Sequence, residues 1–329
     1  MTRFLLRRLA WAALTVLAVA SISFVLMRNV RGGPFDSERR ASAAVEKNLR
    51  ERYRLDWPTW KQFAAYVGPF ELGEHGPAFL GGDGTDTFGG VLAGDFGPSL
   101  QYRDASVNDL LAQSLPISAA LGFLALSWAL AVGITAGIVS ALRRGTTLDV
   151  ALRITATTGI ALPNFAIAGV LVLLFAFVWP ILPVAGHGSW RHLVLPSLAL
   201  GAPFAAYIAR LTRTGMLEAL GEDWIRTAHA KGLPPRLVVT RHALRAGIQP
   251  VISYLGPAAA GVLTGSLVIE RIFAIPGTGS HFVNSALNRD YALAMGVTIL
   301  YTALVCVLNL LVDVVQASLD PRIALEDES

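Results

Sequence analysis

Residues 218–250 form a charged segment between two long apolar segments, and their acidic, basic and histidine side chains could do chemistry. Such side chains can catalyse acid–base reactions or dock a charged partner. The segment cannot enter lipid, because an Arg, Lys or Asp at the centre of a bilayer costs roughly 2.5–3.5 kcal/mol even on the gentler insertion scales. We therefore expect it to stand in water as one ordered unit, and its composition favours a docking surface over a catalyst.

The sequence lacks the common motifs for catalysis and for nucleotide binding. Neither His-Glu-x-x-His nor Gly-x-Ser-x-Gly occurs, which are patterns of metalloproteases and serine hydrolases. The run Gly277–Ser280 is glycine-rich but lacks the lysine of a phosphate loop. We predict a catalytically silent chain that binds no cofactor of its own, and a membrane-embedded hydrolase is the remote alternative.

Candidate metal ligands are few. His187 and His192 flank a predicted outer loop and could bind a metal ion, but we favour a role as loop or interface residues. The single cysteine, Cys306, lies in an apolar run and can form no disulfide within the chain.

The rest of the chain is built to cross a membrane. It is 53% hydrophobic and 15% charged, whereas soluble domains carry about 25% charged residues. A membrane helix needs about 20 mostly apolar residues, so we predict an all-α polytopic protein with six transmembrane helices, the third kinked or ended by Pro163, Pro180 or Pro183. The six stretches are Leu9–Met27, Leu110–Leu142 with a lead-in broken at Pro116, Ile154–Trp179, Leu193–Ala209 with an extension through Leu217, Ala246–Ile269 and Tyr291–Val312.

Positive charge predicts the orientation of these spans. Arg and Lys gather in the N-terminal tail, in residues 143–153 and in residues 210–245, and are sparse in the short loops between them. By the positive-inside rule both termini are therefore cytoplasmic. The first span also resembles a signal peptide, but its apolar run continues too far, and we expect an uncleaved helix.

This topology divides the chain into four parts. We expect an N-terminal tail and first span at 1–27, an external loop region at 28–109, a five-helix core at 110–320 with a cytoplasmic loop at 218–245, and a cytoplasmic tail at 321–329. The external region holds a glycine-rich stretch that predicts loop rather than an independent domain.

The cytoplasmic loop has the pattern of a short helix that lies on the membrane surface. Acidic residues Glu218, Glu222 and Asp223 suit its first turns, and Lys231 followed by Gly232 suits its end. A second short helix can begin at Pro235 and return to the bilayer. The spacing predicts one apolar face made of Leu217, Leu220, Trp224 and Ala228.

The run Arg226–Gly232, Arg-Thr-Ala-His-Ala-Lys-Gly, resembles the coupling loop of importer-type ABC transporter permeases in the dipeptide and oligopeptide branch. Of the generic Glu-Ala-Ala-x3-Gly pattern, only Ala228 and Gly232 are kept. The stretches 94–111, 270–291 and 311–323 resemble further segments of the first membrane subunit of oligopeptide permeases. The likeness covers nearly the whole chain apart from the glycine-rich stretch near 70–92.

This resemblance implies the type I importer fold and a set of partners. These are a second homologous permease subunit, two cytoplasmic ATPases that bind ATP and Mg, an external peptide-binding protein, peptide cargo and the lipid bilayer of a bacterial inner membrane, with no nucleic acid. Dipeptides, glutathione-like peptides or nickel are the alternative cargoes. The implied sites are the ATPase-coupling residues Glu218, Glu222, Trp224, Arg226, Thr227, Ala228, Lys231 and Gly232, the external-loop motif Pro276, Gly277, Gly279, Arg289 and Asp290, and the C-terminal motif Asp320, Pro321 and Arg322.

Two substitutions follow from the coupling assignment. Gly232→Asp and Ala228→Glu each add charge or bulk to the helix, so we expect them to uncouple transport while membrane insertion is kept.

Overall fold

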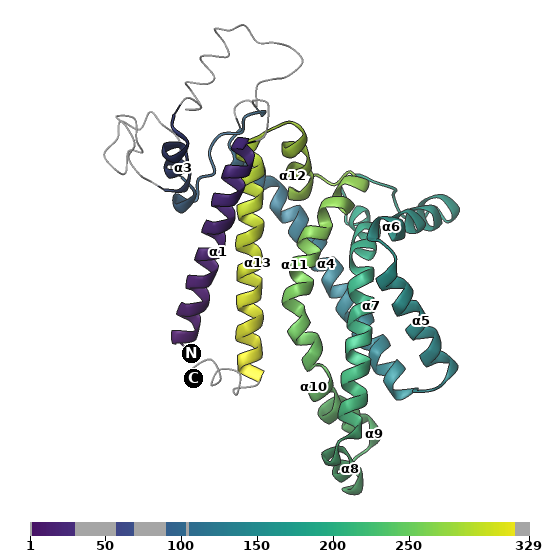
Figure 1. Ribbon diagram of the computed structural model, residues 1–329. Coiled ribbons are helices and arrows are strands. Elements are labelled where there is room, and N and C mark those ends of the chain that lie inside the picture. The colour runs from purple at the N-terminus through teal and green to yellow at the C-terminus, as the bar shows by residue number, and fades with distance from the viewer. Residues whose placement is uncertain (1, 30–56, 69–89, 103–104, 320–329) are drawn as a thin grey trace. The chain divides into compact units, whose positions relative to one another are not determined.

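The structure, a computed structural model, describes residues 2–29, 57–68, 90–102 and 105–319. Over these residues the chain is helical, with one isolated antiparallel bridge between Pro98 and Ser106 (Figure 1). The long helices are α1 (Thr2–Asn29), α4 (Val107–Leu142), α5 (Thr147–Ala161), α7 (Arg191–Gly221), α11 (Gln249–Ile272) and α13 (Tyr291–Leu319). The shorter ones are α3 (Thr59–Val67), η2 (Val91–Ala93), α6 (Asn164–Val172), η3 (Leu173–Val178), α8 (Asp223–Ala230), α9 (Pro235–Leu237), η4 (Val238–Ala243), α10 (Leu244–Gly247) and α12 (Thr278–Leu287).

The predicted all-α polytopic fold is confirmed. Five helices, α1, α4, α7, α11 and α13, are long and apolar enough to cross a membrane, and α5 with α6 and η3 makes a sixth span if that bent pair is counted as one. The bend is 110° and falls between Ala161 and Asn164. Leu162 there is extended, with φ −81° and ψ 131°, because the ring of Pro163 disfavours helical backbone in the residue before it.

The predicted break at Pro116 is wrong. Pro116 lies inside α4, which runs without interruption from Val107 to Leu142. Pro196 and Pro203 lie inside α7 in the same way. In an apolar span the missing N–H can be tolerated, because neighbouring helices and local adjustments of the backbone compensate for the lost bond.

The described chain divides into two compact units. The first contains residues 117–276 and 305–319, and the second contains residues 5–29, 57–68, 90–102, 105–116 and 277–304.

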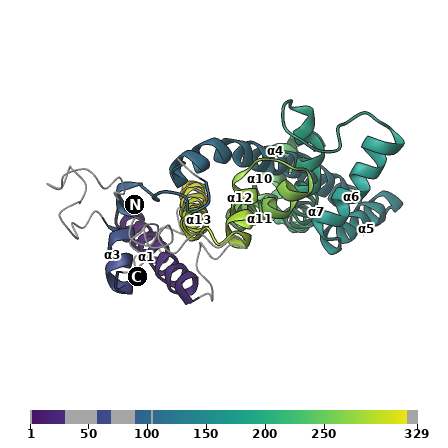
Figure 2. The same ribbon diagram turned by 90° about the horizontal axis from the view of Figure 1, so that it is seen from above.

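In the first unit α7 is the central helix and packs against α5, α6, α10 and α11 (Figure 2). Its contact with α4 is close because small residues line the crossing. A Cβ atom on Gly133 would lie 2.6 Å from the Ala205 carbonyl oxygen, and one on Gly137 would lie 2.5 Å from Thr212 Cβ. These two glycines therefore permit the close approach of the two helices.

In the second unit α1 packs against α3 through aromatic side chains. The Phe24 and Phe63 ring centroids are 5.2 Å apart in an edge-on arrangement, and Tyr66 is buried beside them. Burial raises the pKa of the Tyr66 hydroxyl, so this residue is a neutral part of the core. α3 is the only described helix between α1 and η2, within the predicted external loop region 28–109.

Candidate functional site

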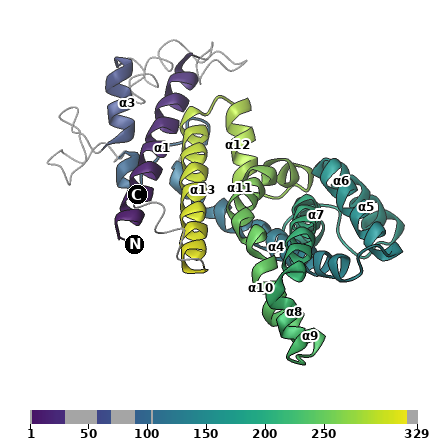
Figure 3. The ribbon, with the colours of Figure 1, turned by 60° about the horizontal axis from the view of Figure 1, so that its bottom comes forward.

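The polar segment after the fourth span folds as a two-part helical projection, residues 222–247. Its first part is α8, and its second part is a return helix in which α9, η4 and α10 follow one another without a gap. Within the first unit the projection extends past the end of α7 (Figures 1 and 3). The second helix begins at Pro235 as predicted, and its middle turn is a π-helix.

The start of α8 differs from the prediction. α7 continues through Gly221, and the chain breaks at Glu222, which is extended with φ −74° and ψ 149°. Glu218 therefore lies in the last turn of α7, and only Glu222 and Asp223 are at the start of α8. Glu222 and Asp223 still place carboxylates at the N-terminus of α8, where negative charge is favourable.

The break at Glu222 also changes which side chains share a face. Ile225 and Ala228 are buried, whereas Trp224 is 40% exposed. Of the predicted face, Leu217, Leu220 and Ala228 pack on one small hydrophobic core under the projection, and only Trp224 does not, because the 3.6-residue period is interrupted at Glu222. Ile225 takes its place there, and Ala141, Met216, Ala219, Val238 and Ala243 complete this core.

This burial changes the expected effect of Ala228→Glu. Ala228 contacts its own fold rather than the surface, so a glutamate there would place a charge in an apolar core. The variant would disturb the projection itself and is not a clean test of docking.

The outer face of α8 consists of the exposed residues Asp223, Trp224, Arg226, Thr227 and Lys231. Arg226 donates to the Asp223 carboxylate at 3.1 Å, and both side chains remain open to solvent. An exposed tryptophan among charges of both signs is the composition of a protein contact, since tryptophan and arginine are frequent anchors of interfaces.

The end of α8 is fixed by Gly232. Its φ is +76°, its N–H donates to the His229 carbonyl at 2.9 Å, and the Leu233 N–H donates to the Ala228 carbonyl at 3.3 Å. These two bonds make a Schellman cap, in which the residue after the C-cap is left-handed and is usually glycine. The predicted glycine stop is confirmed.

We predict that Gly232→Val opens this cap and that Gly232→Asn is tolerated. No atom lies within 4 Å of a Cβ placed on Gly232, so only backbone strain matters. A left-handed L-residue costs roughly 1–2 kcal/mol, and asparagine adopts this conformation more readily than valine. Limited trypsin cleavage after Lys231 should be about tenfold faster in the valine variant. Equal cleavage rates for the two variants would contradict the assignment.

A second feature, which the sequence analysis missed, holds the return helix against α7. A Cβ atom on Gly215 would lie 2.4 Å from the Gly247 carbonyl oxygen, and one on Gly247 would lie 2.9 Å from Met216 Sδ. The two helices thus cross with their backbones in contact, which only glycine permits. The projection is joined to the span that carries it at both of its ends, through the chain at Glu222 and through this crossing.

A buried ion pair ties α7 to the α4–α5 turn. Asp149 is 1% exposed and accepts two hydrogen bonds from Arg213, at 2.9 and 3.0 Å. It also accepts from the Ser140 hydroxyl at 2.6 Å and the Gly145 N–H at 3.0 Å. Arg213 was predicted only as an interfacial positive charge, and its partner is too distant in sequence for a local pattern to indicate.

Removal of this carboxylate should weaken the first unit. We expect Asp149→Ala to lower the thermal midpoint of the purified protein by several degrees, because Arg213 loses a two-pronged partner in a mostly buried position. Asp223→Ala, which removes the carboxylate of the exposed pair with Arg226, is the matched control and should leave the midpoint unchanged, since exposed pairs contribute little. Equal midpoints for both variants would contradict this assignment.

The external-loop motif lies around α12. Asp290 is fully buried and accepts hydrogen bonds from the Ser99 hydroxyl, from the Leu100 N–H at 3.2 Å and from the Leu293 N–H at 3.1 Å. Gly277 is the N-cap of α12, Gly279 is buried in its first turn, and Arg289 has a left-handed φ of +57°. Within the second unit, Asp290 therefore joins segment 94–111 to the start of α13. Pro276 belongs to the first unit, and the C-terminal motif Asp320, Pro321 and Arg322 lies outside the described residues.

The two histidines considered as metal ligands lie close in sequence but do not form a recognisable site. His187 is exposed, and His192 shares a hydrogen bond of 2.9 Å with the Ser189 hydroxyl. Over the described part of the chain, no group of three or more His, Cys, Asp and Glu side chains is arranged to hold a metal ion.

Long apolar helices with a structured, charged projection at one end define a multi-pass membrane protein. The comparison with known families agrees. Residues 133–325 match the binding-protein-dependent transport system inner membrane component, and this chain belongs to that family.

Two full-length relatives show more closely which members of this family the chain resembles. The chain is 42% identical over 325 residues to the oligopeptide transport system permease protein OppB of Escherichia coli (strain K12), covering 98% of this chain and 99% of that protein. It is 41% identical over 325 residues to the dipeptide transport system permease protein DppB of Bacillus subtilis (strain 168), covering 99% of each. The resemblance inferred from the motifs is thereby confirmed.

Proposed function

We propose that this chain is a non-enzymatic, membrane-spanning subunit of an ATP-driven importer of oligopeptides. The full-length similarity to peptide permeases supports the cargo class. The observation that carries the coupling role is the outer face of α8, an exposed tryptophan among charges on a helix whose opposite face is packed into its own unit.

The partners follow from this role. The chain pairs with a second homologous permease subunit, and each binds one of two cytoplasmic ATPases, which hold ATP and Mg. An external peptide-binding protein delivers the cargo. The projection and both termini face the cytoplasm of a bacterial cell, with the spans in its inner membrane, because Arg and Lys gather at the projection's end of the spans.

Coupling proceeds through contacts within the first unit. The ATPase pair closes around ATP and displaces α8, and the Gly215–Gly247 crossing passes that displacement to α7. The ion pair between Arg213 and Asp149 then carries it to the α4–α5 turn. The ATPases can drive this change only if they bind the two states of the permease with different affinity.

We favour oligopeptides over dipeptides as the cargo because segments 94–111 and 270–291 resemble those of oligopeptide permeases. The similarity to a dipeptide permease is nearly as high, so the two cargoes need a direct test. Glutathione-like peptides and nickel remain the more distant alternatives.

The test is uptake by the complete importer in sealed vesicles. The permease pair, its ATPases and the binding protein should accumulate labelled tetrapeptides and pentapeptides with ATP supplied on the ATPase side, and not with ATP omitted. His187→Ala with His192→Ala should leave this uptake intact. Accumulation of dipeptides alone, or uptake that fails in the histidine variant together with bound metal, would overturn the oligopeptide assignment.

A further inference from the structure

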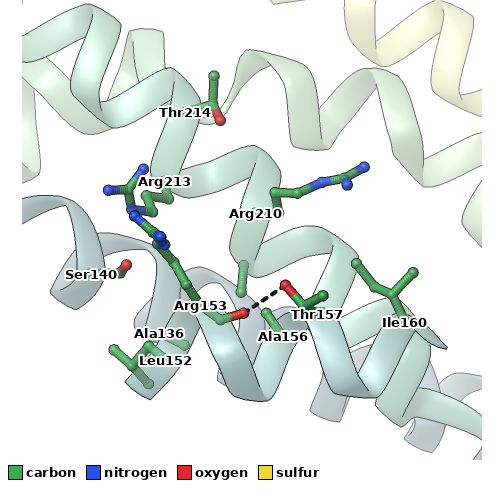
Figure 4. Close-up of a pocket in the computed structure, with 11 residues that line it drawn as sticks. Ala136, Ser140, Leu152, Arg153, Ala156, Thr157, Ile160, Arg210, Arg213 and Thr214 are labelled. Carbon is green, nitrogen blue, oxygen red and sulfur yellow. Dashed lines mark hydrogen bonds between the residues drawn. The ribbon is translucent and has the colours of Figure 1, made fainter. Parts of the chain in front are cut away.

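A pocket in the first unit has features that the transport role does not use. It lies between α4, α5 and α7 near the end that carries the projection, and its volume is about 270 Å³. Arg153, Arg210 and Arg213 line it together with apolar side chains (Figure 4). It therefore combines positive charge with an apolar wall.

The charges at this pocket are not balanced within the described protein. Arg213 is paired with Asp149. Arg210 lies over the Tyr207 ring at 4.7 Å, and no described residue offers a carboxylate to Arg153 or Arg210. Arg213 with Asp149 is neutral, and of the two remaining positive charges only that of Arg153 faces the space beside Arg213 (Figure 4).

The arrangement of the side chains points to an anion. Figure 4 shows Arg153 from α5 and Arg213 from α7 extending toward one another, while Arg210 extends from the other side of α7. Asp149 already pairs with Arg213, so Arg153 carries the guanidinium group at this space to which no described residue offers a carboxylate. Guanidinium groups bind phosphate oxygens well because their N–H donors match that geometry.

The apolar part of the pocket has the form of a track for a hydrocarbon chain. Leu152, Ala156 and Ile160 are four residues apart on α5, so they lie along one face of the helix. All three line the pocket, and Ile160 is 38% exposed. The track leads from the arginine end of α5 into the membrane-spanning part of the helix.

We propose that this pocket binds an anionic phospholipid, with its phosphodiester between Arg153 and Arg213 and one acyl chain along Leu152, Ala156 and Ile160. Basic pockets between transmembrane helices on the cytoplasmic side are known to take such headgroups. Cardiolipin is an anionic phospholipid of this kind and is the probe used below. The proposal rests on the membrane orientation given above but not on the peptide cargo. The bound lipid would bridge α5 and α7.

The experiment measures lipid binding by the whole importer complex. The complex is placed in vesicles of phosphatidylcholine with a small fraction of labelled cardiolipin, and the lipid that is retained on extraction is counted. The test variant is Arg153→Gln with Arg210→Gln, which leaves the Arg213–Asp149 pair in place. Its matched control is Arg143→Gln with Arg144→Gln, which removes the same charge from exposed positions outside the pocket.

We expect the test variant to retain about tenfold less cardiolipin than the wild type, and the control to retain nearly as much. Arg153→Lys with Arg210→Lys should recover most of the binding, which shows that the charge matters and that the fold is kept. Equal loss in the test and control variants would overturn the proposal. Displacement of the lipid by inorganic phosphate would also overturn it, because the site would then bind free phosphate.

A failure of this experiment is distinguishable from a failure of the transport assignment. Peptide uptake by the wild-type complex in the same vesicles tests the transport role, and it does not depend on which lipid is retained.

Discussion

We expect Trp224→Ala to lower ATP hydrolysis stimulated by binding protein and peptide by about 30-fold, while the amount of permease in the membrane stays the same. Trp224 is the largest exposed apolar side chain on the outer face of α8, and truncation of such an anchor at an interface typically costs 2 kcal/mol or more. The hydrophobic core under the projection does not contain Trp224, so the fold is kept.

Trp190→Ala is the matched control for this experiment. Trp190 is 71% exposed and is the N-cap of α7, so it lies at the end of this helix opposite to the projection. Its replacement should leave stimulated hydrolysis unchanged. If both tryptophan variants keep wild-type stimulation, the outer face of α8 is not the ATPase contact.

Gly247→Val should abolish transport and reduce the amount of correctly assembled complex. Even the first added carbon of the valine would lie 2.9 Å from Met216 Sδ and 3.0 Å from the Met216 backbone nitrogen. Overpacking of this kind costs about 1–3 kcal/mol, and here it acts on the contact that holds the return helix to α7.

Gly169→Ala supplies the comparison, because no atom lies within 4 Å of a Cβ placed on this glycine inside α6. Assembly can be measured by co-purification of the ATPases. Gly247→Val should lose most of the co-purified ATPase and Gly169→Ala should lose none. Normal assembly and transport in Gly247→Val would show that the crossing is not needed.

Local patterns were sufficient for the features that depend on neighbouring residues. Apolar run length located the spans, and the Gly232 stop with Pro235 located the turn in the projection. Each of these features is decided within a few residues of the chain. Family resemblance supplied the rest of the assignment, including the partners.

The features that were missed depend on contacts between distant residues. The Asp149–Arg213 pair and the Gly215–Gly247 crossing each join positions that no periodicity connects. The break at Glu222 was missed for a different reason: glutamate is a good helix former, and Gly221 before it, which could have indicated the end of α7, was not taken as a stop. Because of that one error, the prediction placed Glu218 in the surface helix, although it belongs to α7, and assigned Trp224 to the wrong face.

The central claim is that the outer face of α8 contacts an ATPase in the cytoplasm. Thr227→Cys, on a Cys306→Ala background, places one thiol on this face, and Ala228→Cys places one on the buried face. In cells, a short thiol-specific crosslinker should join the Thr227→Cys protein to the ATPase and leave the Ala228→Cys protein unlinked. No capture of the ATPase at Thr227 in the assembled importer, or labelling of that thiol by an impermeant reagent from outside the cell, would contradict the account.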